Sequence, residues 1–396
     1  MKDVSLVMSI VALVKCNSYD YPLVKQAVER GLNLLGGAEQ FAKPGEKILL
    51  KPNFLISDNR EHITNTHFAV FKAVAEAFKK TGARISYGDS PAFGSAAAVA
   101  KRCAIYSVAE ELGIELQEFN EGKDVFFKEG VQNRKFTIAE AVLEADGIIS
   151  LPKIKTHQLT ILTGCIKNQL GCVPGILKGE LHVKLPDPLK FAQMLVDLNN
   201  IIKPRLYVMD GIVAMEGNGP SGGTSKPMKV LLFSTDPVAL DATVCRMIKV
   251  EPENIPTIRF GREQGMGVSA EDQITIVGDN IADFIIDDFD ININAQWGGT
   301  GFKKKLSDGL IKLLGGLLIS KPYILADKCV KCGICVKQCP VLSKAVNWRN
   351  EDKTKPPVYN YKLCIKCYCC QEVCPEGAIK LKKPFLRWLF SRKRAE

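Results

Sequence analysis

CVKCGICVKQCP at residues 329–340 and CIKCYCCQEVCP at residues 364–375 are the two most informative stretches of this sequence. They agree at six of twelve positions, which are four cysteines, one lysine and one proline, so they form an internal repeat. Each has the spacing C-x2-C-x2-C-x3-C-P. Three cysteines spaced three residues apart wrap a tight turn around one inorganic group, and the fourth, beside a helix-breaking proline, points away from it.

This spacing is typical of bacterial ferredoxins, in which the fourth cysteine of each run binds the cluster of the other run. The pattern implies that one [4Fe–4S] cluster is held by Cys329, Cys332, Cys335 and Cys374. It implies that a second is held by Cys364, Cys367, Cys370 and Cys339. Zinc is an alternative, but a zinc site needs four ligands rather than two runs of four. One degenerate cluster is the other alternative. Cys369 is expected to pack rather than to bind.

Length and composition indicate a folded chain of two or three domains, with 396 residues, 46% hydrophobic and 24% charged. The apolar run at residues 5–14 is shorter than the roughly 18 residues of a membrane span, and it lacks the features of a signal peptide. We therefore expect a cytoplasmic protein, in which the 14 cysteines do not form disulfides.

Positive charge is concentrated at the C-terminal end. Residues 321–396 hold 17 Lys and Arg against 6 Asp and Glu, a net of +11, while the whole chain carries +10. Each oxidised cluster with its four thiolates adds about −2, so part of this charge compensates for the clusters. The remainder favours an acidic redox partner protein or a low-potential electron donor. No known nucleic-acid-binding motif is present, so we expect no nucleic acid.

The first 300 residues alternate between apolar strands and helical patterns, which predicts an α/β domain with a mostly parallel sheet and helices on both faces. Five predicted strands end near residues 50, 87, 151, 209 and 233. In a parallel sheet these ends lie along one edge, where open α/β sheets bind ligands. The side chains there that we expect to bind a small anionic ligand are Lys51, Asn53, Asp89, Ser90, Lys153, Asn168 and Asp210.

Residues 155–182 form a long, glycine-punctuated connection, and such connections are usually functional. We expect four of its side chains to be catalytic: Lys155, His157, Lys167 and His182. Either histidine is suited to general acid–base work near neutral pH, to metal binding, or to a structural hydrogen bond. Lys178 lies in the same segment.

A G-x-G-x-x-G match at residues 217–222 follows a strand, but Pro220 leaves no helix to bind a dinucleotide phosphate. We expect instead a glycine loop that holds an anion through its N–H groups or closes over a site. Asp236 is expected to cap a helix.

The strings LPKIKTH, TGCIKNQLGCVPG, KGELH, DGIVAMEGNGP and STDPVALDA resemble domain-of-unknown-function family 362, whose longer members end in a two-cluster ferredoxin module. The resemblance implies an iron–sulfur protein of the kind found in anaerobic bacteria and archaea, and it supplies no reaction. A weaker similarity to the lactate racemase family keeps a non-redox enzyme as an alternative.

The expected domains are an α/β domain at residues 1–300, an amphipathic connecting helix at 301–322, a ferredoxin domain at 323–383 and a basic aromatic tail at 384–396. Such a tail suits peripheral contact with an anionic membrane surface, packing on the neighbouring domain, or fraying.

Three functions fit these features. The first is an oxidoreductase in which electrons pass through the clusters to a small anionic substrate. Its carboxylate or phosphate is bound by Lys51, Lys153, Lys155 and Lys167, while His157 or His182 moves protons. The second is an electron carrier or a maturation factor that acts on a protein partner. The third is a non-redox enzyme with structural clusters.

Overall fold

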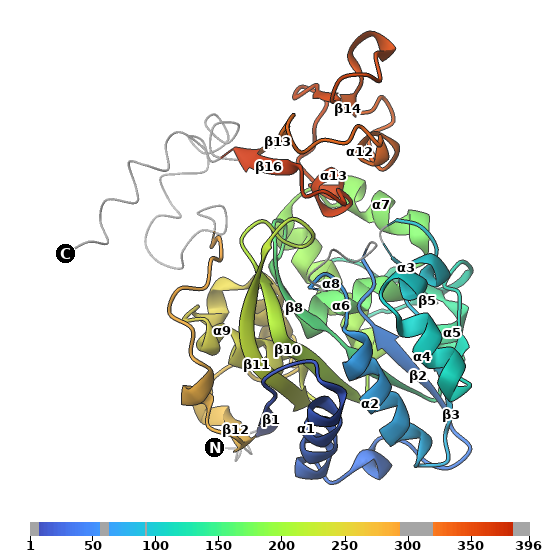
Figure 1. Cartoon of the computed structure of the whole chain (residues 1–396), viewed down its shortest axis with the longest axis vertical. Helices are drawn as coiled ribbons and strands as arrows, with labels where there is room; N and C mark the ends of the chain where they lie inside the picture. Colours follow the sequence, from blue (N-terminus) through green and yellow to red (C-terminus); the bar gives the residue numbers. More distant parts are fainter. Residues whose placement is uncertain (1–7, 56–62, 92, 294–319, 383–396) are drawn as a thin grey trace, which may run out of the picture.

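The computed structural model describes residues 8–55, 63–91, 93–293 and 320–382. Within them lie a large α/β unit and a small cysteine-rich unit, residues 320–382 (Figure 1). The predicted connecting helix falls outside the described residues except for its last three positions, and the predicted tail at 384–396 falls wholly outside them. No helix in the described ranges has both the length and the hydropathy of a membrane span.

One ten-stranded sheet organises the α/β unit, with its main path in the order β12-β1-β11-β10-β7-β2-β3-β4. The strands are β1 Ser9–Lys15, β2 Lys47–Pro52, β3 Arg84–Tyr87, β4 Glu115–Leu116, β7 Gly147–Leu151, β8 Lys153–His157, β9 Ile161–Thr163, β10 Leu206–Glu216, β11 Thr224–Ser234 and β12 Ile274–Gly278. Strands β10, β7, β2, β3 and β4 run parallel, as does the β1–β12 pair, and only β11 on this path runs against its neighbours. The predicted fold class, a mostly parallel sheet with flanking helices, is confirmed.

Successive side chains of the strands point to opposite faces of the sheet, so they pack into two hydrophobic cores, one on each face. In β1, Val11 and Leu13 enter one core, while Ala12 and Val14 enter the other. The first core contains apolar side chains of α6 Cys165–Asn168, α8 Pro188–Ile202, α9 Pro237–Met247 and α10 Pro256–Glu263. The second contains those of α1 Tyr21–Leu34, α2 Phe68–Lys79, α3 Ala96–Arg102 and α4 Ile105–Leu112 (Figure 1). A separate hairpin pairs β5 Gly122–Phe126 with β6 Lys135–Ala139.

The direction of β11 corrects one prediction. Because β11 is antiparallel to β1 and β10, the turn that follows it lies at the opposite edge of the sheet from the ends of β2, β3 and β7. Asp236 in that turn accepts hydrogen bonds from the amides of Val238 (2.8 Å) and Ala239 (2.9 Å), and so caps α9 as expected. It also accepts one from Ser9 Oγ (2.6 Å) at the start of β1.

Two further predictions about the chain path need correction. Residues 155–182 are not an irregular connection, because they contain the end of β8, then β9, α6, a short 3-10 turn at Gln169–Cys172 and α7 Gly175–Lys184. The strand predicted to end near residue 209 continues as β10 to Glu216, so Asp210 lies within a strand rather than after it.

In the cysteine-rich unit, β13 Lys321–Ile324 pairs antiparallel with β16 Ile379–Lys382, and β14 Val346–Asn347 pairs with β15 Val358–Tyr359. Each cysteine run contains one single-turn helix, which begins two residues after the second cysteine of the run: α12 Ile334–Lys337 and α13 Cys369–Glu372. Figure 1 shows α13 beside α7 and near the tip of the β10–β11 hairpin.

The glycine loop at residues 217–222 forms that tip and docks on the cysteine-rich unit. Gln371 Nε2 donates to the carbonyl oxygens of Asn218 (2.9 Å) and Gly219 (3.1 Å), and Ser221 Oγ donates to the carbonyl of Gln371 (3.0 Å). The loop thus offers carbonyl groups to the cysteine-rich unit rather than N–H groups to an anion, and the other expectation, that it closes over a site, stays a prediction.

Candidate functional site

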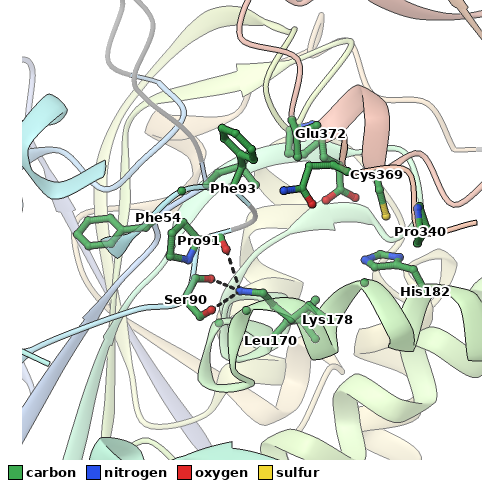
Figure 2. A pocket seen from close by; sticks show the side chains of 18 of the residues that line it. Phe54, Ser90, Pro91, Phe93, Leu170, Lys178, His182, Pro340, Cys369 and Glu372 are labelled. Atoms are coloured by element: carbon green, nitrogen blue, oxygen red, sulfur yellow. Dashed lines mark hydrogen bonds between the residues drawn. The ribbon is translucent and has the colours of Figure 1, made fainter. Parts of the chain in front are cut away.

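A cavity of about 780 Å³ lies between the carboxyl edge of the sheet and the cysteine-rich unit. Its wall is formed by the loops after β2 and β3, by β8–α7 and by residues of both cysteine runs (Figure 2). Seven of the predicted site residues line it: Asn53, Asp89, Ser90, Lys155, Lys167, Asn168 and His182. Four do not: Lys51, Lys153, His157 and Asp210.

Strand β8 explains how three of these side chains are oriented. Lys153, Lys155 and His157 alternate along the strand, so all three project from the same face. Lys155 Nζ donates to Asn53 Oδ1 (2.5 Å) and to the carbonyl of Thr64 (2.6 Å), which holds its cation at the cavity wall.

Lys51 lies directly behind the cavity wall. Its ammonium is fully buried, 2.9 Å from Asp89 Oδ1 and 3.3 Å from Asn168 Oδ1. Asp89 Oδ2 also accepts a hydrogen bond from the amide of Phe54 (2.7 Å). This ion pair fixes the loops after β2 and β3 that face the cavity, so Lys51 positions the site and does not face a ligand in it.

Lys153 and Asp210 form a second buried ion pair, with Nζ and Oδ2 2.8 Å apart and both side chains inaccessible to solvent. The hydroxyl of Tyr19 donates to Asp210 Oδ1 (2.8 Å) and accepts from Lys153 Nζ (2.5 Å). Neither charged residue lines the cavity, so the structure does not support a ligand-binding role for them. Their network ties the loop after β1 to β8 and β10.

His157 faces the cysteine-rich unit. Its Nδ1 accepts from the amides of Leu159 (3.0 Å) and Thr160 (3.2 Å), which leaves the ring proton on Nε2. Nε2 lies 3.0 Å from Glu372 Oε1, although neither atom is in hydrogen-bond geometry, so the contact is electrostatic. Burial, together with the Lys167 charge, lowers the pKa of His157, and Glu372 opposes this.

Glu372 lies between the two units and was not among the predicted site residues, because it falls inside a cysteine run whose thiols carry the recognisable pattern. Burial raises the pKa of Glu372, but His157, Lys167 and His182 outweigh burial, so the pKa is well below its usual range. An ionised carboxylate thus lines the cavity beside Cys369 (Figure 2).

His182 is a neutral imidazole in the cavity wall. Its ring stacks on Phe191, with the centroids 4.6 Å apart, and burial lowers its pKa to about 4. Its Nδ1 is buried and has no hydrogen-bond partner in the described residues. Lys167 also lines the cavity, and no ion pair or hydrogen bond of its ammonium is found among the described residues. These two groups are free to bind a ligand.

The predicted cysteine sets surround two separate voids. Cys329, Cys332, Cys335 and Cys374 line one, with Pro375, and Cys339, Cys364, Cys367 and Cys370 line the other, with Pro340. In each set the thiols surround a void rather than a point. Among the described residues, no three His, Cys, Asp or Glu side chains come close enough together to bind a single metal ion. All fourteen cysteines are free thiols, so both sets offer the four-thiolate donor set of a [4Fe–4S] cluster.

The two runs also share a backbone conformation. Lys331 and Lys366, each just before the second cysteine, are left-handed, as are Gly333 and Tyr368 just after it. The amides of Ala345 and Ala378 donate to the sulfurs of Cys339 and Cys374, each at 3.3 Å. Tyr359 adds an O–H donor to Cys370 Sγ (3.1 Å). Hydrogen bonds to ligand sulfurs are a feature of cluster sites.

Both the α/β unit and the cysteine-rich unit match known protein families. The family model "Domain of unknown function (DUF362)" matches residues 48–246, and the model "4Fe-4S dicluster domain" matches residues 328–378. The thylakoid-associated protein sll1697 of Synechocystis is 35% identical over 263 residues, which cover 66% of this chain and 81% of that protein. The cysteine-rich region is 36% identical over 50 residues to pyruvate synthase subunit PorD of Methanosarcina barkeri, covering 13% of this chain and 48% of that protein.

Among solved structures, the lactate racemase apoprotein of Thermoanaerobacterium thermosaccharolyticum matches at 12% identity with a TM-score of 0.41, over 59% of this chain and 55% of that one. The ferredoxin match makes this chain an iron–sulfur protein with a [4Fe–4S]-binding domain.

Proposed function

Since this chain belongs to the DUF362 family and ends in a 4Fe-4S dicluster domain, we propose that it is an oxidoreductase that relays electrons through two [4Fe–4S] clusters to a small anionic substrate in the cavity. One observation carries the proposal. Cys339 and Pro340 line both the void of the second cysteine set and the cavity. When bound, the clusters supply one-electron redox chemistry.

The exposure of the cysteines supports a path for electrons through the cysteine-rich unit, from the first cysteine set at the surface to the second set at the cavity. Cys332 of the first set is exposed, whereas Cys339, Cys367 and Cys370 of the second set are buried. A protein or small donor thus has access to the first set, while the second set faces the cavity.

The cavity wall suits an organic acid with an apolar body. Its apolar side chains include Phe54, Leu170 and Val373, and its cations include Lys155 and Lys167. Lys167, which has no carboxylate partner in the described residues, binds the acid group of the substrate. Glu372, held near His157, disfavours a second acid group at that end of the cavity.

His157 and His182 have different roles in this scheme. His157 Nε2 carries the ring proton, because its Nδ1 accepts two backbone hydrogen bonds, whereas His182 Nδ1 is buried without a hydrogen-bond partner in the described residues. A substrate that takes up electrons also takes up protons. Of the two rings His182 lines the cavity, while His157 lies behind its wall, beside Glu372. We assign proton movement to this side of the cavity.

The test is the reoxidation of dithionite-reduced protein by a panel of small organic acids and quinones without oxygen. The proposal expects at least one acid to reoxidise the clusters, and Lys167→Met to weaken its binding about 10-fold or more. Lys190→Met is the control, because that exposed lysine at the start of α8 does not line the cavity. Failure of every acid, with intact clusters, contradicts the proposal.

A second function, an electron carrier or maturation factor for a protein partner, has one specific observation in its favour. Val330 (59% exposed) and Leu342 (fully exposed) are apolar side chains on the surface of the cysteine-rich unit. This alternative expects salt-sensitive binding of an acidic protein and no effect of Lys155→Ala or Lys167→Met on electron transfer. Membrane contact through the tail at 384–396 is also a proposal, and the thylakoid association in the name of the Synechocystis relative gives a reason to test it.

A further inference from the structure

Ser90 and Lys178 form a buried pair in the cavity wall that the electron relay does not use. Ser90 follows β3 at the carboxyl edge of the sheet, and Lys178 lies on α7. Both line the cavity, and they are 7% and 8% exposed. Lys178 Nζ lies 2.7 Å from Ser90 Oγ (Figure 2).

The other contacts of the Lys178 amine orient it toward that hydroxyl. Nζ also contacts the carbonyl oxygens of Ser90 and, at 3.1 Å, Pro91. Carbonyl oxygens accept only, so each takes one N–H. A neutral amine then has its lone pair left for the Ser90 hydroxyl proton, whereas an ammonium donates its third proton to Oγ. Both protonation states fit the same heavy-atom geometry.

The balance between these states lies near neutral pH. Burial lowers the pKa of Lys178 to about 7, and the charges of Lys51 and Lys167 lower it as well, while Asp89 opposes the shift. A substantial fraction of the amine is therefore unprotonated at pH 7 to 8 and available as a base.

We propose that Ser90 is a nucleophile, activated by Lys178 as general base, that takes an acyl group from an ester or thioester of an apolar carboxylic acid. A serine paired with a lysine base is an established arrangement for acyl transfer. The apolar wall provides room for the acyl chain, and the Lys167 ammonium provides positive charge for the oxyanion. This activity needs no electrons, although it uses the same cavity and the same Lys167 ammonium as the proposed relay.

The chemistry balances with water as the only co-reactant. Ser90 Oγ forms a bond to the acyl carbon while its proton moves to Lys178 Nζ, and the carbonyl π pair moves onto oxygen. The tetrahedral species collapses, the bond to the alcohol or thiol breaks, and Lys178 returns the proton to that leaving group. Water then attacks the acyl-serine with Lys178 again as base, which releases the acid and restores Ser90.

A purely structural lysine is the competing explanation, since Lys178 also ties the turn after β3 to α7. The experiment treats the anaerobically purified full chain with a fluorophosphonate probe, and locates the modified residue by peptide mass spectrometry. If Ser90 and Lys178 act as nucleophile and base, the probe labels Ser90, and the labelling rate rises as the pH rises through about 7. The Ser90→Ala protein is not labelled.

Lys178→Arg separates the two explanations, because arginine keeps a cation and N–H donors for the carbonyls but does not act as a base. The nucleophile proposal expects labelling of a folded Lys178→Arg protein to fall about 100-fold or more. Lys184→Arg, on the same helix, is the control and keeps full labelling. Absence of labelling in the unaltered chain, labelling elsewhere than Ser90, or full labelling of Lys178→Arg overturns the proposal.

Discussion

The contact between Gly222 and Gly377 gives the sharpest prediction about how the two units are joined. A Cβ on Gly222 would lie 3.0 Å from Gly377 Cα and 2.8 Å from Asn218 Nδ2. Asn218 Nδ2 already donates to the carbonyl of Ile379 (3.1 Å), and the Gly377 contact is with backbone, which cannot rotate away as a side chain can. Gly222→Val therefore pushes the hairpin tip away from the cysteine-rich unit, and overpacking of this kind costs about 1–3 kcal/mol.

That cost acts on the docked state, because the clash lies between the two units, although Glu376 and Ala378 on either side of Gly377 line the first cysteine void. A loss of about 1–3 kcal/mol corresponds to a change of about 5- to 150-fold in the equilibrium between docked and open forms. Hydrogen exchange measures it directly, since amides protected by docking exchange faster by the same factor. We expect this increase at residues 217–222 and 369–379, and no change in β2 or β7.

Gly179→Val is the matched control, because a Cβ at Gly179 meets nothing within 4 Å. It adds the same side chain in open space on α7. Unchanged exchange in Gly222→Val, or an equal increase in Gly179→Val, refutes the docking argument.

Three further predictions concern single side chains. Asp210→Asn leaves the Lys153 ammonium buried without its carboxylate, so the free energy of unfolding by urea should fall by about 3–5 kcal/mol; a loss below about 1 contradicts this. His182 has a pKa of about 4 in the folded protein, below its unfolded value, so its contribution to the free energy of unfolding is full above about pH 6.5 and is lost as the pH falls toward 4. His182→Phe should reduce this acid loss of unfolding free energy by up to about 3 kcal/mol, and an unchanged pH dependence contradicts the prediction. Tyr359→Phe removes the O–H donor to Cys370 Sγ and should lower the reduction potential of one cluster in an EPR titration; two unshifted potentials contradict this.

The sequence predicted the fold class and both cysteine sets because their signals are local. A cysteine spacing fixes which thiols a short turn brings together, and alternating apolar patterns identify strands and helices. The direction of β11 was not predictable in this way. The direction of β11 depends on the hairpin that joins it to β10, and the glycine loop of that hairpin was expected to hold an anion or to close over a site rather than to reverse the chain.

The candidate site was predicted in part. Lys155, Lys167 and His182 reach the cavity, but Lys153 does not, because Asp210 lies opposite it within the next strand and neutralises it. Such pairing between distant residues leaves no mark in local sequence. Glu372 was not predicted, because the only pattern at its position is the spacing of the cysteines around it. Its burial, which is unusual for a carboxylate, is visible only in the structure.

Iron and sulfide content of the anaerobically purified chain tests the central claim most directly. Two [4Fe–4S] clusters predict about eight iron and eight sulfide per chain, and Cys339→Ser should reduce both toward four, since it removes a ligand of the cluster beside the cavity. About four iron in the unaltered chain, or zinc in place of iron, contradicts a pair of clusters leading to the cavity.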